Sequence, residues 1–153
     1  MALRNIKTEG NPVLRTVCKN VPEVTDSLKR LIDDMFDTMY DSNGVGLAAP
    51  QIGIVKRIVV IDDTEGHKYA MVNPVITETS GEQISQEGCL SLPGFAGRVK
   101  RPLKVTVKAL DRDGKEFTVE AEGFLAVIMC HEIDHLDGIL YKDKAFEYGA
   151  AQK

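Results

Sequence analysis

The chain has 153 residues, of which 43% are hydrophobic and 27% are charged, as expected for one globular domain with a sizeable core. Its net charge of −4 and its pI of about 5.4 argue against a basic surface for nucleic acid. No apolar run approaches the roughly 20 residues that span a bilayer, and the charged N-terminal residues do not resemble a signal peptide. Three cysteines at irregular spacing favour a reduced, cytoplasmic protein over a disulfide scaffold. Without repeats or linkers, residues 1–153 are expected to form a single domain.

The first third of the chain contains one clear helix. Residues 4–24 are mixed in character, with a short helical turn expected near Pro12 to Thr16. A helix is predicted over residues 25–42, where Thr25 or Asp26 can cap the N-terminus. Its apolar residues recur at helical spacing and predict packing on the core: Leu28, Leu31, Ile32, Met35, Phe36 and Met39.

Residues 44–53 form a loop of small residues, Gly-Val-Gly-Leu-Ala-Ala-Pro-Gln-Ile-Gly. Gly44 and Gly46 allow another chain to approach the backbone closely. The loop is a poor phosphate-binding loop, since it lacks a following Lys-Ser/Thr pair and a preceding strand. Gln51 is the side chain in this loop that could hold an oxyanion.

Strands dominate the middle of the chain. Residues 56–62 predict a buried strand, and residues 69–79 predict another that Asn73-Pro74 interrupts. Residues 80–87 are expected to be a polar connection. Residues 103–110 and 115–122 alternate apolar and polar, and Asp113-Gly114 between them predicts a β-hairpin. The tail from about residue 146 is expected to fray.

The most informative stretch is His131-Glu132-Ile133-Asp134-His135. On a helix, His131 and His135 point the same way about one turn apart, as metal ligands do, and Glu132 can reach a metal-bound water. The helix is expected to begin near Gly123 and to end at Asp137-Gly138. The alternative is a pair of core histidines, each bonded to a carbonyl or carboxylate.

Two histidines do not complete a catalytic site, so another segment must supply a third ligand. Cys89 follows Gly88, which lets the backbone come close and the thiol project into a site. The alternative for Cys89 is a buried free cysteine. His67 lies in a polar turn and is not expected to be a ligand, and Cys18 is expected to be a structural thiol.

Three stretches together resemble the signature motifs of the bacterial peptide deformylase family. They are Gly44–Gln51, Glu87–Ser91 and His131–Gly138, in that order, and the resemblance runs from about residue 3 to about residue 145. It implies an α+β fold, with antiparallel β-sheets packed around a central metal-binding helix and an N-terminal amphipathic helix. It also implies that Cys89, His131 and His135 bind one Fe²⁺, for which Ni²⁺, Co²⁺ or Zn²⁺ can substitute.

The resemblance implies a hydrolase that acts on a linear amide. The substrate is the N-terminal formyl-methionine of newly synthesised polypeptides, and formate is released. Metal-bound hydroxide would attack the formyl carbon, and Glu132 would take a proton and pass it to the leaving amine. The metal, the Gln51 side chain and the Leu90 backbone N–H would hold the oxyanion.

The methionine side chain is expected to enter an apolar pocket beside His131. The expected substrate-binding positions are Gly44, Val45, Gly46, Glu87, Gly88, Phe124, Val127 and Ile128. Glu87 either orders the Gly-Cys loop or is an ordinary surface acid. Asp134 is expected to form a salt bridge, with Arg101 as the candidate partner, and Cys130 to pack in the core.

The chain departs from the family pattern at two places. Ala96 stands where some members have an Arg, which leaves open how the peptide backbone is anchored. The long basic C-terminal helix that docks some members on the ribosome is missing, so at most transient ribosome proximity is expected, with no membrane or direct nucleic-acid binding.

Two other functions are alternatives to this interpretation. A metallopeptidase that cuts internal bonds usually takes a third His or Glu ligand downstream, but only Glu147 and no His follows His135. The second alternative is a structural metal domain or an inactive relative. A structural metal site needs neither Glu132 nor Gln51, so the presence of both residues argues against it.

Overall fold

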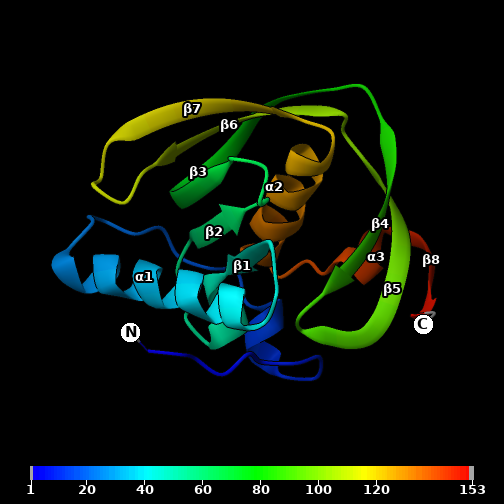
Figure 1. Ribbon diagram of the computed structural model, residues 1–153, viewed down its shortest axis with the longest axis horizontal. Helices are drawn as coiled ribbons and strands as arrows, with labels where there is room; N and C mark the ends of the chain where they lie inside the picture. The colour runs from blue at the N-terminus through cyan, green and yellow to red at the C-terminus, as the bar shows by residue number, and fades with distance from the viewer. Residues whose placement is uncertain (1, 152–153) are drawn as a thin grey trace.

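The computed structural model describes residues 2–151 and places helix α2 (Phe124–His135) between two antiparallel sheets (Figure 1). The fold is mixed α and β, as the sequence predicted. None of the helices within these residues has both the length and the apolar character needed to cross a membrane.

The larger sheet has the strand order β1-β2-β3-β6-β7. Its strands are β1 (Gly46–Ala48), β2 (Ile58–Asp62), β3 (Lys68–Ser80), β6 (Lys104–Leu110) and β7 (Glu116–Glu122). The predicted hairpin is confirmed, since β6 and β7 pair from Lys104↔Glu122 to Leu110↔Glu116. The predicted interruption of β3 is a shift in register near Asn73, which has a φ of 52° and hydrogen bonds to the backbone of Val21.

The smaller sheet has the order β4-β5-β8, with strands β4 (Gln83–Cys89), β5 (Leu92–Arg101) and β8 (Ala145–Ala150). The prediction of a polar connection over residues 80–87 was wrong for β4. The inward residues of β4 include Ser85 and Glu87, which contact polar groups, so the strand lacks the apolar alternation that predicts strands.

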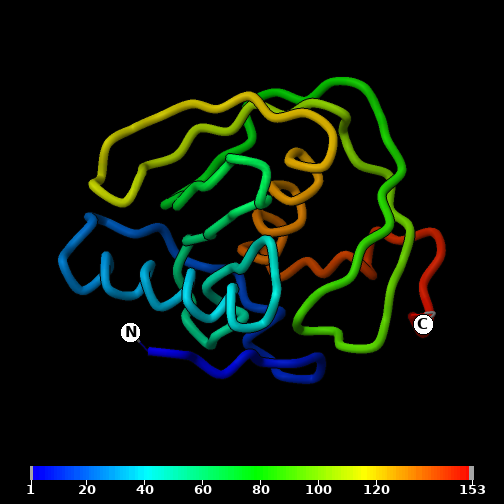
Figure 2. Tube along the Cα trace, viewed as in Figure 1, coloured from blue at the N-terminus to red at the C-terminus, as the bar shows by residue number. Residues whose placement is uncertain are grey.

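The tail was expected to fray from about residue 146, but it pairs with β5 as strand β8. Residues 152–153 of that tail lie outside the described residues. Figure 2 shows the C-terminal segment beside β5, while the N-terminal segment runs along α1 (Asp26–Asp41), where the Arg4 backbone N–H donates to Thr38. Pairing with β5 gives the short polar tail hydrogen bonds that its sequence alone does not reveal.

The helices bury the apolar faces that the sequence indicated. Thr25 caps α1 by accepting a hydrogen bond from the Leu28 backbone N–H, and the predicted apolar stripe is buried. Two 3₁₀ turns, η1 (Pro12–Arg15) and η2 (Ala49–Ile52), and the short helix α3 (Tyr141–Lys144) complete the fold. Helix α2 contacts both sheets and is almost entirely buried, so its side chains can form an enclosed site.

Candidate active site

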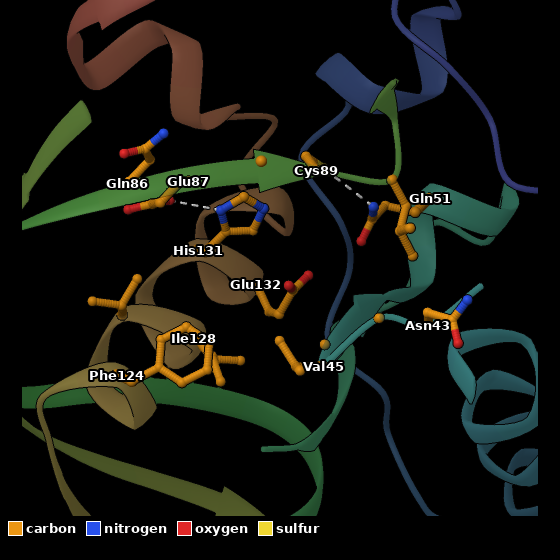
Figure 3. A pocket seen from close by; sticks show the side chains of 15 residues that line it. Asn43, Val45, Gln51, Gln86, Glu87, Cys89, Phe124, Ile128, His131 and Glu132 are labelled. Carbon is orange, nitrogen blue, oxygen red and sulfur yellow. Dashed lines mark hydrogen bonds and ion pairs between the residues drawn. The ribbon is translucent and has the colours of Figure 1, made fainter. Parts of the chain in front are cut away.

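A pocket of about 420 Å³ opens between β1, β4 and α2 (Figure 3). It contains every residue that the sequence assigned to catalysis or substrate binding, together with two of the three expected metal ligands, Cys89 and His131. The third, His135, is buried and is not part of the lining. Its lining is Asn43, Gly44, Val45, Gly46, Gln51, Gln86, Glu87, Gly88, Cys89, Leu90, Phe124, Val127, Ile128, His131 and Glu132. Asn43 and Gln86 were not expected, because neither belongs to a motif with a recognisable chemical role.

Cys89, His131 and His135 converge at this pocket. One potential ligand atom from each lies within 4.8 Å of the others, and Cys89 Sγ is 3.4 Å from His135 Nε2. Cys89 comes from the end of β4, while the two histidines occupy successive turns of α2. A sulfur and two imidazole nitrogens at this spacing suit a divalent transition metal.

Glu87, which also lines the pocket, orients His131 through its Nδ1 nitrogen. Its Oε1 lies 2.8 Å from His131 Nδ1, and Arg101 donates to both of its oxygens at 2.8 Å. Ser85 donates a further hydrogen bond to Glu87. Burial raises the pKa of Glu87, but the hydrogen bonds from Arg101 and His131 outweigh it and lower the pKa to about 2. The ionised carboxylate favours a proton on Nδ1 of His131 and leaves Nε2 available for a ligand.

The sequence left two alternatives for Glu87, a residue that orders the Gly-Cys loop or an ordinary surface acid, and its burial excludes the second. Glu87 is 6% exposed, so it is not an ordinary surface acid. The predicted ion pair between Arg101 and Asp134 is confirmed at 2.8 Å. Arg101 thus joins Glu87 on β4 to Asp134 on α2, and it ties the smaller sheet to the helix.

Glu132 projects into the pocket opposite Gly46. A Cβ added at Gly46 would lie 2.6 Å from Glu132 Oε2 and 2.8 Å from its Cγ, so this position has no space for a side chain. Glu132 Oε1 is buried without a hydrogen-bond partner among residues 2–151. Burial raises the pKa of Glu132 to about 7. A buried carboxylate with a free oxygen is suited to accepting a proton from a bound molecule.

Gln51 is held by its own loop. Its Oε1 accepts a hydrogen bond from the Ala48 backbone N–H at 2.9 Å, which directs Nε2 toward Ser91 Oγ at 3.1 Å and Cys89 Sγ at 3.5 Å. Leu90, between Cys89 and Ser91, lines the same pocket. The Gln51 amide is therefore a donor fixed beside the sulfur (Figure 3).

The far end of the pocket is apolar. Val45 from the β1 side faces Phe124 and Ile128 on α2, and Val127 completes this end (Figure 3). Val127 and Ile128 are buried, whereas Phe124 is 59% exposed at the rim. This end can receive an unbranched apolar side chain.

The remaining candidates lie away from the pocket. His67 pairs with Asp63 at 2.7 Å in the turn after β2, as expected for a residue that is not a ligand. Cys18 and Cys130 are buried free thiols, and burial raises the pKa of Cys130 to about 11. Both cysteines pack in the core, as predicted.

Comparison with known proteins shows extensive similarity. A family model described as polypeptide deformylase matches residues 3–149. A peptide deformylase of Acetivibrio thermocellus is 55% identical over 148 residues, covering 97% of this chain and 86% of that protein. One of Agathobacter rectalis is 57% identical over 144 residues, covering 94% and 90%. The crystal structure of a peptide deformylase from Legionella pneumophila superposes with a TM-score of 0.91 at 50% identity, covering 94% of this chain and 86% of that one.

Proposed function

The chain belongs to the polypeptide deformylase family, and we propose that Cys89, His131 and His135 form its metal centre with Glu132 as general base. The protein is a hydrolase that removes the N-formyl group from newly synthesised polypeptides. The observation that carries the assignment of roles is the convergence of one sulfur and two imidazoles in the same site as Glu132 Oε1, which has no hydrogen-bond partner within residues 2–151. The free cysteines suit the reducing cytoplasm, which we propose as its location.

The family is metal-dependent, and the donors present fit that requirement. We propose Fe²⁺ as the ion, one per chain, with Ni²⁺, Co²⁺ or Zn²⁺ able to replace it. When bound, such an ion lowers the pKa of a water and polarises a carbonyl oxygen. The Glu87 carboxylate, bonded to His131 Nδ1, would keep that imidazole in the tautomer and orientation that a ligand needs.

The protein groups around this centre supply the proton transfers and the charge stabilisation. Glu132 accepts a proton from the attacking water and returns it to the amine nitrogen as the C–N bond of the formyl group breaks. The Gln51 Nε2 amide and the Leu90 backbone N–H donate to the carbonyl oxygen as negative charge develops on it. One such donor contributes about 3 kcal/mol of transition-state stabilisation. Formate and a free methionine amine leave.

Two sheet edges flank the pocket and offer an anchor for the peptide backbone. β4 is an edge strand of the smaller sheet and β1 an edge strand of the larger one. An extended peptide between Gly44–Gly46 and Glu87–Gly88 would pair with backbone groups, and the methionine side chain would enter the apolar end. Ala96 lies on β5, paired with Gly149 of β8, so this anchor does not depend on an Arg at position 96.

The reaction is tested by formate release from formyl-Met-Ala-Ser, using protein prepared without oxygen and loaded with Fe²⁺ or Ni²⁺. Acetyl-Met-Ala-Ser is the matched control peptide and should release no acetate. Metal bound at one equivalent without any formate would contradict the proposed active site.

Cys89→Ala is expected to weaken metal binding by at least about 100-fold, because it removes one of three ligands, a larger loss than that of a supporting residue. Metal content after dialysis against a weak chelator measures this. Cys130→Ala is the control, since Cys130 packs in the core away from the pocket. Equal metal retention by the Cys89 variant and the parent would remove Cys89 from the ligand set.

Gly46→Ala is expected to lower kcat/KM about 100-fold, because the new methyl group would displace Glu132 by a distance that matters for proton transfer. Gly149→Ala is the matched control, since a Cβ at Gly149 meets no atom within 4 Å. Formate release is the assay for both variants. Undiminished turnover by Gly46→Ala would show that Glu132 need not keep its observed position.

A further inference from the structure

Tyr141, the first residue of α3, covers one face of the His131 imidazole. The ring centroids are 5.7 Å apart and the planes differ by 23°. Tyr141 is 2% exposed, yet its hydroxyl has no hydrogen-bond partner among residues 2–151. A buried tyrosine normally satisfies its hydroxyl. The contact that Tyr141 makes with His131 is therefore made by its ring.

Strands β5 and β8 lie beside α3 (Figure 1), and a residue of each contacts Tyr141. Gly97 of β5 lies so close that an added Cβ would be 3.2 Å from Tyr141 Cε2. Tyr148 of β8 packs against Tyr141 with centroids 5.7 Å apart, and Phe95 stacks on Tyr148 at 5.5 Å. A continuous series of rings thus connects the C-terminal strand to His131.

The same region supports Cys89. Tyr141 belongs to a small core cluster, and Cys89 packs against that cluster. The other members are Leu14, Leu92, Val99 and Leu140. Two of the three proposed ligands therefore rest on packing that α3 and β5 provide.

The contacts of His131 show what Tyr141 adds. The hydrogen bond that His131 Nδ1 makes to Glu87 fixes the position of Nδ1, but a single hydrogen bond does not fix the plane of the ring. His135 meets His131 edge-on, with centroids 5.1 Å apart and an interplanar angle of 67°. Stacking by Tyr141 adds a contact over a face of the ring and so limits rotation of the imidazole.

We propose that Tyr141 is a positioning residue that holds the His131 imidazole in the plane required for metal binding, and that β8 keeps Tyr141 in place through Tyr148. This inference rests on the proposed role of His131 as a ligand. It assigns to the C-terminal strand a part in metal retention.

The test compares Tyr141→Leu with Tyr141→Phe in Co²⁺-substituted protein. The measurements are the rate of metal transfer to excess chelator and the visible absorption spectrum of the bound Co²⁺. Tyr141→Leu should lose metal about 10-fold faster and show an altered spectrum, as for other supporting contacts of metal ligands. Tyr141→Phe keeps the ring and should match the parent in both.

Tyr148→Ala supplies a second test at a more exposed position, 39% accessible, where unfolding is less of a concern. It should also accelerate metal loss. Phe146→Ala is the control on the same strand, because Phe146 is exposed and packs under Arg98.

Lower thermal stability of Tyr141→Leu with an unchanged rate of metal loss and an unchanged spectrum would overturn the inference, since Tyr141 would then be an ordinary core residue. Failure of the parent chain to bind Co²⁺ would overturn the proposed metal centre and this inference with it.

Discussion

Glu132→Gln is expected to keep its metal and to lose about 10²- to 10⁴-fold in kcat/KM. The amide has the shape of the carboxylate but cannot accept a proton, and Glu132 is not among the proposed ligands. Formate release measures the loss, and elemental analysis measures the bound metal. Glu122→Gln is the matched control, because Glu122 is an exposed residue of β7 that lies outside the active-site pocket.

The same substitution also separates catalysis from stability. Burial disfavours the charged form of Glu132, which raises its pKa to about 7, and Oε1 has no partner among the described residues. A neutral amide removes that desolvation cost, so the variant should unfold at the same temperature as the parent or higher, as is common where function conflicts with stability. Full turnover by Glu132→Gln would exclude Glu132 as the base, and loss of metal would point to a ligand role instead.

Local patterns predicted those parts of the fold that depend on neighbours in sequence. The helix α1 was recognisable from Thr25 and its apolar stripe, and the β6–β7 hairpin from Asp113-Gly114. Most residues around the pocket came from three short motifs, and Phe124, Val127 and Ile128 came from their place on the helix that leads to His131. The structure brings these segments together. Each of these signals spans fewer than about twenty residues.

The missed parts depend on contacts between distant polar residues. Strand β4 was not recognised because its inward residues are polar: Ser85 bonds Glu87, and Glu87 bonds Arg101 and His131. The sequence predicts the pairing of Arg101 with Asp134, but the second partner of Arg101, Glu87, becomes evident only when β4 lies beside β5. The contact between Tyr141 and His131 could not be predicted, because the sequence around a single aromatic residue does not show which distant side chain it will pack against.

Arg101→Met is expected to destabilise the protein by about 3–5 kcal/mol, the usual cost of removing one partner from a buried ion pair. Arg101 is 3% exposed and bonds two carboxylates, Glu87 and Asp134. Met fills much of the same volume, so most of the loss comes from leaving the charge of Glu87 unpaired beside His131. Urea unfolding of the metal-loaded protein measures the change in free energy.

Two further variants show whether charge or packing causes this loss. Arg112→Met removes a surface pair with Asp33, whose side chains are 44% and 53% exposed, and should cost less than about 1 kcal/mol. Arg101→Met combined with Glu87→Gln should recover part of the stability, because no ionised carboxylate then remains unpaired between β4 and His131. If the double variant is as unstable as the sum of the two single changes, the loss comes from packing around Arg101. In that case, the ion pairs of Arg101 with Glu87 and Asp134 would serve to orient the His131 imidazole, and pairing of the buried Glu87 charge would add little to stability.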